Sequence, residues 1–267
     1  MAYFTDKVVV VTGASEGIGR ALCLDLAANG AKVVLAARSE KRLNSLKLEI
    51  ENKGGTVLSV PTDVTQEHAC RGLVDRTVAE FDRIDILVNN AGRTMWTMFD
   101  DIKDLSVFDK IIQLNYLGCV YCTYHALPYI KKTKGLIVGV SSLAGLTGIP
   151  ARTAYAASKH AMVGFFDSLR IELRGSGVDV TMIAPDFVLS EIHRRALDGF
   201  GKPLGESPLQ ESKIMTAEKC ASLIMGALEK RQRVLITSLR GKVGRWIKLI
   251  APGLVDKVAA KAIEQKK

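Results

Sequence analysis

Short runs of consecutive apolar residues recur along the whole chain, separated by stretches with helical periodicity. Most runs are continuous in Val, Ile and Leu rather than alternating, which is typical of strands buried on both faces of a parallel sheet. Seven are predicted as strands: 7–12, 31–37, 56–61, 84–89, 135–141, 179–184 and 233–237. The alternation of strand and helix predicts an α/β fold, a doubly wound parallel sheet with seven strands in a single domain.

The chain has 267 residues, of which 48% are hydrophobic; this suffices for one large core, and no linker divides the chain. The longest departure from the alternation is the segment 185–213, which is rich in Gly, Pro and charged residues. We predict that this segment is a lid over a site. We expect a single main domain over residues 1–239, which includes this segment, followed by a basic C-terminal tail over residues 240–267.

A glycine-rich turn, "VTGASEGIGRAL", follows the first predicted strand directly. Glycines let the backbone approach a ligand closely, and the helix that begins near Gly17 directs free N–H groups and a positive dipole end at the same point. Between a strand and an amphipathic helix, such a turn predicts binding of a dinucleotide pyrophosphate, as in a Rossmann fold. We assign to the cofactor site Gly13, Ser15, Gly17, Ile18 and Gly19.

The end of the second predicted strand bears on the choice of dinucleotide. A site for NAD usually has an acidic residue here that binds the ribose hydroxyls, whereas this chain has Ala37 followed by Arg38. An arginine can pair with the 2′-phosphate of NADP. Glu16, inside the glycine turn, acts against this preference because a carboxylate would repel the phosphate. We expect NADP(H) and leave NAD(H) open.

Tyr155 and Lys159 lie four residues apart in "TAYAASKHA", a stretch predicted to be helical. On a helix this spacing places both side chains on one face, so the lysine cation can reach the neighbourhood of the phenol. An isolated pair of this kind is more often a surface Tyr stacked on a Lys stem. The alternative is that the cation lowers the pKa of Tyr155 from the free value of about 10.

Further polar motifs stand where predicted strands end. The motif "NNAG", residues 89–92, closes the fourth strand, and Ser142 comes just after the fifth. Asn115 lies on the helix between these two strands. Because ligands of parallel sheets bind outside the carboxyl ends of the strands, we expect these residues to face one crevice.

In this order and at these separations, the motifs resemble those of the short-chain dehydrogenase/reductase family. The resemblance covers nearly the whole chain, through Thr12 to Gly19, Asp63, 89–92, Asn115, Ser142 and Tyr155-x-x-x-Lys159. It implies a Rossmann fold and hydride transfer between NADP(H) and a ketone or secondary alcohol. The alternative from another class is a cofactor-binding, membrane-associated regulator or scaffold with little turnover; its usual mark, a missing Tyr or Lys, is not seen.

The resemblance also implies roles for individual residues. Tyr155 would be the general acid and base, and Lys159 would acidify it and bind the nicotinamide ribose. Ser142 would place the substrate oxygen, and Asn115 would hold a water that links Lys159 to solvent. The remaining cofactor contacts implied are Asp63, Val64, Asn89, Ala91, Gly92, Pro185 and Val188. One departure is Asp186, which stands after Pro185 where the family often has Gly.

The tail concentrates the positive charge of the chain. Residues 240–267 carry eight Lys or Arg against Asp256 and Glu264, whereas the whole chain has a net charge of +9. Apolar residues, Trp246 among them, alternate with these charges, and Pro252 divides the tail into two short predicted helices. Such a tail can contact a membrane surface or pack over the substrate pocket or a neighbouring subunit. By resemblance to the steroid- and lipid-acting branch of the family, we expect an apolar lipid- or steroid-like substrate.

Other classes of partner are not indicated. No run resembles a nucleic-acid module, a signal peptide or a bilayer-spanning segment. The face that carries Cys119, Cys122 and His125 lacks a second pair with metal-ligand spacing, so we predict buried thiols and no metal. Five scattered cysteines suit a reducing compartment, and we expect a cytoplasmic protein that is peripheral at a membrane if the tail binds one. The family resemblance implies a homodimer or homotetramer.

Overall fold

The structure, a computed structural model, describes residues 3–209 and 214–264, with side chains up to 261. Its centre is a seven-stranded parallel sheet with the strand order β3-β2-β1-β4-β5-β6-β7. This confirms the predicted doubly wound Rossmann sheet and all seven predicted strands to within two residues at each end. The strands are β1 Val8–Thr12, β2 Lys32–Ala37, β3 Thr56–Pro61, β4 Ile86–Asn89, β5 Leu136–Val140, β6 Asp179–Ala184 and β7 Val234–Ile236.

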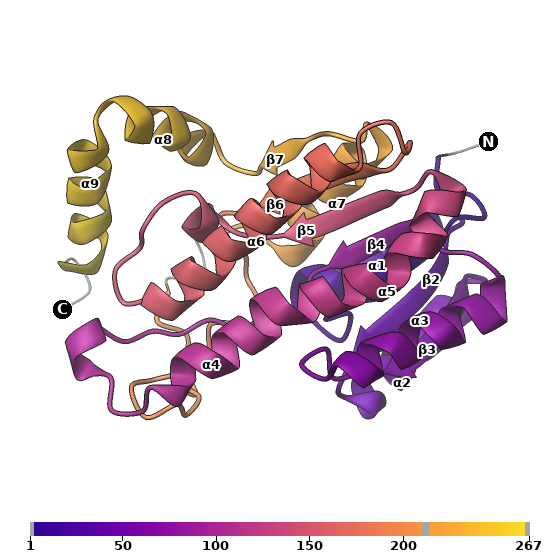
Figure 1. Cartoon of the computed structure of the whole chain (residues 1–267). Helices are drawn as coiled ribbons and strands as arrows, with labels where there is room; N and C mark the ends of the chain where they lie inside the picture. Colours follow the sequence, from indigo (N-terminus) through magenta and orange to yellow (C-terminus); the bar gives the residue numbers. More distant parts are fainter. Residues whose placement is uncertain (1–2, 210–213, 265–267) are drawn as a thin grey trace.

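Helices cover both faces of the sheet (Figure 1). One layer contains α1 Gly17–Ala28, α2 Glu40–Asn52 and α7 Ala217–Glu229, and the other contains α3 Glu67–Phe81, α5 Gly118–Thr133 and α6 Thr153–Glu172. The first strand shows why its apolar run is continuous. Val9 and Val11 belong to the core under the first layer, whereas Val8 and Val10 belong to the core under the second. Both faces of β1 are therefore buried, one in each core.

The chain changes direction across the sheet between β1 and β4. From β1 it winds outward to β2 and β3, and then returns so that β4 pairs with the other edge of β1. The carboxyl ends of β1 and β4 thus lie side by side while their following loops diverge. In an open α/β sheet this is the place where a crevice for a ligand forms.

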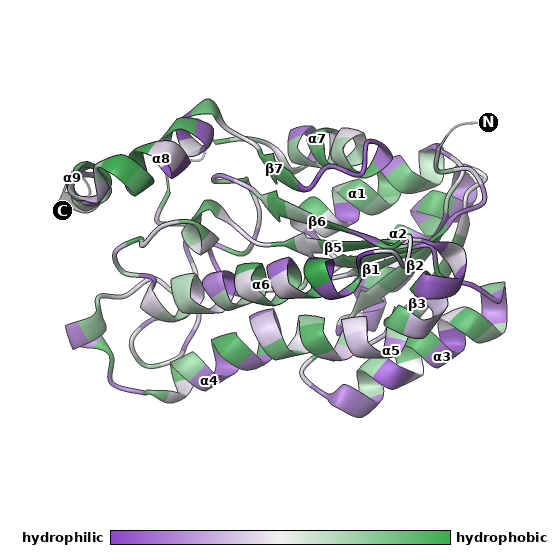
Figure 2. Ribbon diagram, turned by 45° about the horizontal axis from the view of Figure 1, so that its top comes forward, coloured by the Kyte–Doolittle hydropathy of each residue, from purple (hydrophilic) through white to green (hydrophobic). Residues whose placement is uncertain are grey.

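The remaining elements lie around that carboxyl edge. They are η1 Phe99–Asp101, α4 Ser106–Ile112, the π-helical turn η2 Gln113–Leu117, η3 Leu143–Gly145, α8 Leu239–Ile250 and α9 Pro252–Glu264. The predicted break of the tail into two helices at Pro252 is confirmed. Figures 1 and 2 show α8 and α9 projecting from the main body beside the carboxyl edge of the sheet. Within the described ranges, no helix is long and apolar enough to cross a bilayer.

The face of α5 that carries cysteines is part of the core. Cys119 and Cys122 are buried in the second layer, together with Cys70 of α3. Burial raises the pKa of Cys119 to about 12. His125 of the same helix instead meets Glu67, with 2.5 Å between Nε2 and Oε1. Among the described residues, no group of three His, Cys, Asp or Glu side chains is arranged to hold a metal ion.

Phe166 of α6 is the largest fully buried side chain of the second layer. It packs on β5 at Gly139, where an added Cβ would lie 2.6 Å from the Phe166 ring. We expect Phe166→Ala to lower the free energy of unfolding by about 3–5 kcal/mol, because the cavity cannot be filled by the rigid sheet beside it. Urea denaturation measures this. Leu48→Ala, at an exposed position on α2, is the control and should change stability by less than about 0.5 kcal/mol; a similar loss in both variants would contradict this account of the core.

Candidate active site

A cavity of about 1260 Å³ opens at the carboxyl edge of the sheet. It extends from the glycine turn after β1 to the helices of the tail. Most of the predicted site residues line it, although they come from seven separate segments of the chain: Gly13, Ser15, Gly17, Ile18, Arg38, Asp63, Val64, Ala91, Gly92, Ser142, Tyr155, Lys159, Pro185 and Val188. Of the predicted lid, side chains between 185 and 195 and Leu209 contribute to the lining, and its last four residues, 210–213, fall outside the described ranges.

Three predicted site residues lie behind this lining. A Cβ on Gly19 would lie 2.3 Å from the carbonyl oxygen of Gly13, so Gly19 allows the helix to pack on the turn. Asn89 is turned into the core, where its Nδ2 donates to Thr123 Oγ1 at 3.1 Å. The next residue, Asn90, faces the cavity instead. The Asn90 side chain thus lines the cavity and the Asn89 side chain does not, because a β-strand directs successive side chains to opposite faces. Asn89 as a cofactor contact stays a prediction.

Asn90 connects the two strand ends at which the sheet changes direction. Its Nδ2 donates to the carbonyl oxygens of Thr12 at 2.9 Å and Gly13 at 3.2 Å. The backbone N–H groups of Asn90 and Ala91 both donate to Thr12 Oγ1 at 3.0 Å. These bonds fix the glycine turn relative to the exit of β4, a role that the sequence motif alone does not reveal.

Asn115, the third residue behind the lining, is completely buried in the π-helical turn η2. Its Oδ1 accepts from the Arg93 N–H at 2.8 Å, and its Nδ2 donates to the Arg93 carbonyl and to Ser158 Oγ, both at 2.9 Å. A Cβ on Gly92 would lie 3.3 Å from Asn115 Oδ1 and 3.6 Å from Lys159 Nζ. The turn thus brings the backbone after β4, Asn115 and Lys159 together; π turns of this kind are frequent at functional sites.

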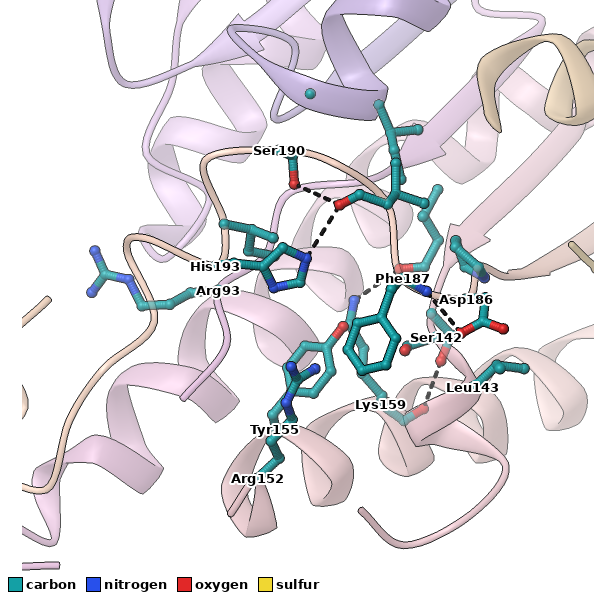
Figure 3. Close-up of a pocket in the computed structure, with 18 of the residues that line it drawn as sticks. Arg93, Ser142, Leu143, Arg152, Tyr155, Lys159, Asp186, Phe187, Ser190 and His193 are labelled. Carbon is teal, nitrogen blue, oxygen red and sulfur yellow. Dashed lines mark hydrogen bonds between the residues drawn. The ribbon is translucent and has the colours of Figure 1, made fainter. Parts of the chain in front are cut away.

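Ser142, Tyr155 and Lys159 converge on one side of the cavity (Figure 3). Ser142 follows β5 and caps η3, where its Oγ accepts from the Ala144 N–H at 3.1 Å. Lys159 Nζ donates to the carbonyl oxygen of Val140 at 2.8 Å and lies 5.8 Å from the centre of the Tyr155 ring. The two helical residues therefore share one face, as their spacing predicts.

Burial dominates the acid–base properties of this pair. Desolvation raises the pKa of Tyr155, while its hydrogen bond with Ser142 and the charge of Arg152 offset part of the rise. Desolvation also lowers the pKa of Lys159 to about 8, against a partial opposing effect of Cys119. Arg152, a residue that the motif analysis did not single out, thus contributes a positive charge that favours the Tyr155 phenolate.

Arginine side chains surround Glu16 at the opposite end of the cavity. Glu16 forms ion pairs with Arg42 of α2 and with Arg195 of the predicted lid, the latter at 2.7 Å between Oε1 and Nη1. Arg38 and Arg93 line the same region. Burial, together with the charges of Arg38 and Arg195, lowers the pKa of Arg93. Glu16, which in the sequence argues against NADP, is thus paired with arginines, and the charge around it is net positive.

Asp186, the departure from the family pattern, attaches the tail to the main domain. It accepts from Ser238 Oγ at 2.6 Å, and it forms an ion pair with Arg240 at the start of α8. Burial acts to raise the pKa of Asp186, but the hydrogen bonds from Arg240 and Ser238 outweigh it and hold the pKa below its ordinary value. The carboxylate therefore positions α8 at the mouth of the cavity.

The tail forms an apolar wall of the cavity. Val243 and Ile247 of α8 and Val255 of α9 line it, opposite the loop after η3. Lys248 reaches back across this opening, and its Nζ donates to the carbonyl oxygen of Leu146 at 2.8 Å. Packing of the tail over the pocket, one of the two arrangements open from the sequence, is thus what the structure shows.

Residues 7–199 match the family model of the short chain dehydrogenases. The chain belongs to the short-chain dehydrogenase/reductase family. Over 258 residues it is 35% identical to 11-beta-hydroxysteroid dehydrogenase 1A of Arabidopsis thaliana, covering 94% of this chain and 73% of that protein. It is 34% identical to a dehydrogenase/reductase SDR family protein 7-like of Dictyostelium discoideum, covering 95% and 80%. Within the family, the chain groups with members named for 11-beta-hydroxysteroids.

Solved structures of the family share the fold. A short-chain dehydrogenase/reductase from Burkholderia phymatum in complex with NAD superposes with a TM-score of 0.85 at 25% identity, covering 95% of this chain and 96% of that one. An alcohol dehydrogenase from the archaeon Thermococcus sibiricus, complexed with 5-hydroxy-NADP, gives a TM-score of 0.74 at 26% identity, covering 86% and 95%. The chain is an oxidoreductase of the family that acts on CH–OH groups.

The residues present fit a nicotinamide dinucleotide. Gly13 has a φ of +65°, and a Cβ there would lie 2.9 Å from Ala91 Cα, so only glycine gives the turn its close approach to the β4 exit. The turn leads into α1, whose N-terminal N–H groups suit a pyrophosphate. Arg38 and Asp63 lie at one end of the cavity lining and Lys159 at the other, which suits a long, two-headed ligand.

The depressed pKa of Lys159 predicts a pH-dependent stability. Between about pH 8 and 10.5 the unfolded chain binds a proton at Lys159 that the folded chain has lost, so stability rises with pH across this window and not below it. We expect the wild type to gain on the order of 3 kcal/mol relative to Lys159→Met over this range. Urea unfolding at a series of pH values measures the difference. Lys131→Met, at an exposed position of α5, should run parallel to the wild type; parallel curves for Lys159→Met would contradict the shift.

Proposed function

We propose that this chain is an NADP(H)-dependent oxidoreductase that interconverts a ketone and a secondary alcohol, with Tyr155 as general acid and base. The observation that carries the proposal is the convergence of Ser142, Tyr155 and Lys159 on a cavity that also contains the glycine turn. Relatives named for hydroxysteroids support an apolar, lipid- or steroid-like substrate.

Each of the four site residues has its own role in the proposed reaction. The nicotinamide, when bound, supplies or accepts the hydride. As a ketone is reduced, the Tyr155 hydroxyl donates its proton to the carbonyl oxygen, and the Ser142 hydroxyl hydrogen-bonds that same oxygen. Lys159 stabilises the phenolate that remains and is placed to bind the nicotinamide ribose. Asn115 fixes the backbone beside Lys159. It would also hold a water that links Lys159 to solvent, and Tyr155 would be reprotonated by this route.

Positive charge around Glu16 supports NADP(H) over NAD(H). Four guanidinium groups, those of Arg38, Arg42, Arg93 and Arg195, lie in the cavity lining against the carboxylates of Glu16 and Asp63. A phosphate on the adenine ribose would supply negative charge that balances this excess of positive charge. Arg195 comes from the lid, so the same phosphate would also draw the lid onto the cofactor.

The outer face of the tail supports contact with an anionic membrane surface. Leu239, Trp246, Leu249 and Ile250 of α8 are exposed, the Trp246 side chain to 65%. The same helix and α9 carry Lys and Arg beside this face. Apolar side chains flanked by cations suit the boundary between lipid headgroups and acyl chains. Since the inner face of the tail lines the cavity, an apolar substrate could enter directly from the lipid.

Quaternary structure and location stay predictions. Tyr124 of α5 and Ile171 of α6 are large exposed side chains on the layer that the homodimer or homotetramer would use. A cytoplasmic enzyme that is peripheral at a membrane fits the tail as described. Neither assignment enters the chemistry of the site.

Tyr155→Phe should reduce the rate of ketone reduction roughly 10²–10⁴-fold, because the general acid is lost while the ring and its packing are kept. We would follow NADPH oxidation with 2-alkanones of about four to twelve carbons, a series with roughly one to nine chain methylenes. With the wild type, kcat/KM should rise by up to about fourfold for each methylene that the apolar wall buries. Tyr124→Phe, which removes an exposed phenol, is the matched control.

Two outcomes of this experiment would contradict the proposal. Undiminished turnover by Tyr155→Phe would show that another group supplies the proton. Binding of NADPH without turnover of any ketone would favour a regulatory or scaffold protein, which would not depend on the Tyr155 hydroxyl.

The tail gives a prediction that is independent of turnover. Replacing Trp246, Leu249 and Ile250 by Ser should weaken cosedimentation with vesicles of phosphatidylcholine and phosphatidylglycerol by about tenfold or more, because the apolar anchor is lost. Vesicles of phosphatidylcholine alone should bind the wild type more weakly, since they lack the anionic charge. Leu48→Ser, at an exposed apolar position on α2, is the control. Equal binding by all three proteins would contradict a membrane role for this face, and a loss of dimer in the triple variant would assign the face to a second copy.

A further inference from the structure

Arg152 is a buried cation beside the catalytic tyrosine. It immediately precedes α6, three residues before Tyr155, and lines the cavity although only 4% of its surface is exposed. Ala151, directly before it, has a φ of +60°, a left-handed conformation that non-glycine residues seldom adopt. The backbone therefore accepts local strain at the point that directs Arg152 inward rather than into solvent.

Aromatic rings hold the guanidinium in place. Its central carbon lies 4.2 Å from the centre of the Trp96 ring and 5.0 Å from that of Phe187. Figure 3 shows Arg152 and Phe187 beside Tyr155 at the cavity. Stacking of this kind stabilises a cation through the flat face of the guanidinium. The N–H groups on its edge take no part in the stacking and need acceptors of their own.

Two N–H groups on that edge are unpaired. Among the residues that the structure describes, neither Nε nor Nη2 of Arg152 has a hydrogen-bond partner, and both atoms are shielded from water. Burial lowers the pKa of Arg152 only to about 10, so the side chain is charged at neutral pH. A buried, charged donor without an acceptor is unfavourable by several times the strength of an ordinary hydrogen bond. Its position beside the reacting groups indicates that the acceptor is a ligand.

We propose that Arg152 binds a carboxylate of the substrate through its Nε–H and Nη2–H groups. These two donors lie side by side in one plane, which matches the two oxygens of a carboxylate. Because both atoms are shielded in this structure, binding requires a neighbouring side chain such as Phe187, which stacks on the guanidinium, to move aside. The proposal rests on the assignment of Tyr155 as the acid and base, and it deepens the proposed function by naming the substrate class. The substrate is an amphiphilic keto acid, or the corresponding hydroxy acid, rather than a neutral lipid.

The geometry limits the separation of the two groups on the substrate. Arg152 and Tyr155 line the same cavity, and the charge of Arg152 acts on the Tyr155 phenol, so the two side chains end near each other. With the carbonyl at Tyr155 and the carboxylate at Arg152, only a few bonds separate the two. The apolar remainder of the molecule then extends toward the wall formed by Val243, Ile247 and Val255.

A binding experiment tests this without turnover. Decanoate and decanamide, which differ in charge and not in shape, would be titrated into the full-length protein in the presence of NADP⁺ by calorimetry. Because Trp96 stacks on Arg152, its fluorescence in a Trp246→Phe background gives a second readout at the proposed site. We expect decanoate to bind about 10–100-fold more tightly than decanamide, as for a charge-assisted pair, and Arg152→Met to abolish the preference. Arg71→Met, on the exposed surface of α3, should keep it.

Arg152→Lys addresses the case in which the Met variant does not fold. It keeps the charge and loses the planar pair of donors, so the preference should fall without vanishing. Equal binding of decanoate and decanamide by the wild type would overturn the proposal whatever the variants do. A preference that persists unchanged in Arg152→Met or Arg152→Lys would also overturn it, since another group would then hold the carboxylate.

Kinetics separate this role from an effect on Tyr155. For 4-oxodecanoate, Arg152→Met should raise KM about 10–100-fold, with little change of KM for the methyl ester. Because the charge of Arg152 also lowers the pKa of Tyr155, the pH profile of kcat should move to higher pH with both substrates. A KM for 4-oxodecanoate that Arg152→Met leaves unaltered would show that Arg152 acts on the Tyr155 phenolate alone, and would overturn the proposal. If no ketone is reduced while the preference for decanoate holds, the carboxylate site stands and the proposed reaction fails.

Discussion

The hydrogen bonds between Thr12 and the chain after β4 are the constraint on which the site depends. The Thr12 hydroxyl accepts two backbone N–H groups, and its carbonyl oxygen accepts the Asn90 side chain. These bonds join the glycine turn to the β4 exit at the point where the sheet changes its direction of winding. Because both exits are held, the loops that leave them diverge and the cavity opens between them.

From this point the site is built by two further connections. The π-helical turn brings Asn115 against Arg93 and Gly92, and thereby fixes the backbone next to Lys159. At the other side of the cavity, Asp186 holds Arg240 and Ser238, so the tail is part of the pocket rather than an appendage. A residue that departs from the family pattern thus explains how the apolar wall is attached.

Local patterns were sufficient to predict the sheet and the face shared by Tyr155 and Lys159. The strands could be recognised because parallel strands bury both faces, so each run is apolar throughout. The pair could be recognised because helical spacing is short-range. The motif at 89–92 predicts a segment that faces the crevice, but it does not state which of its two adjacent asparagine side chains lines the cavity; in the structure this is Asn90.

Long-range electrostatics could not be predicted in the same way. Glu16 counts against NADP when only its neighbours in sequence are considered, yet in the fold it meets Arg195, 179 residues away. The burial of Arg152 likewise depends on Trp96 and Phe187, which lie in separate loops. Such contacts arise only once the sheet has brought its carboxyl ends together, and they determine the charge at both ends of the cavity.

Cofactor preference tests the account most directly, because it depends on the charge that the fold assembles around Glu16. The measurement is the dissociation constant of NADPH and of NADH for the purified protein by calorimetry, repeated with Arg38→Ala. The account predicts that NADPH binds about 10–100-fold more tightly than NADH and that Arg38→Ala removes most of the difference. Equal affinities, or tighter binding of NADH, would contradict it.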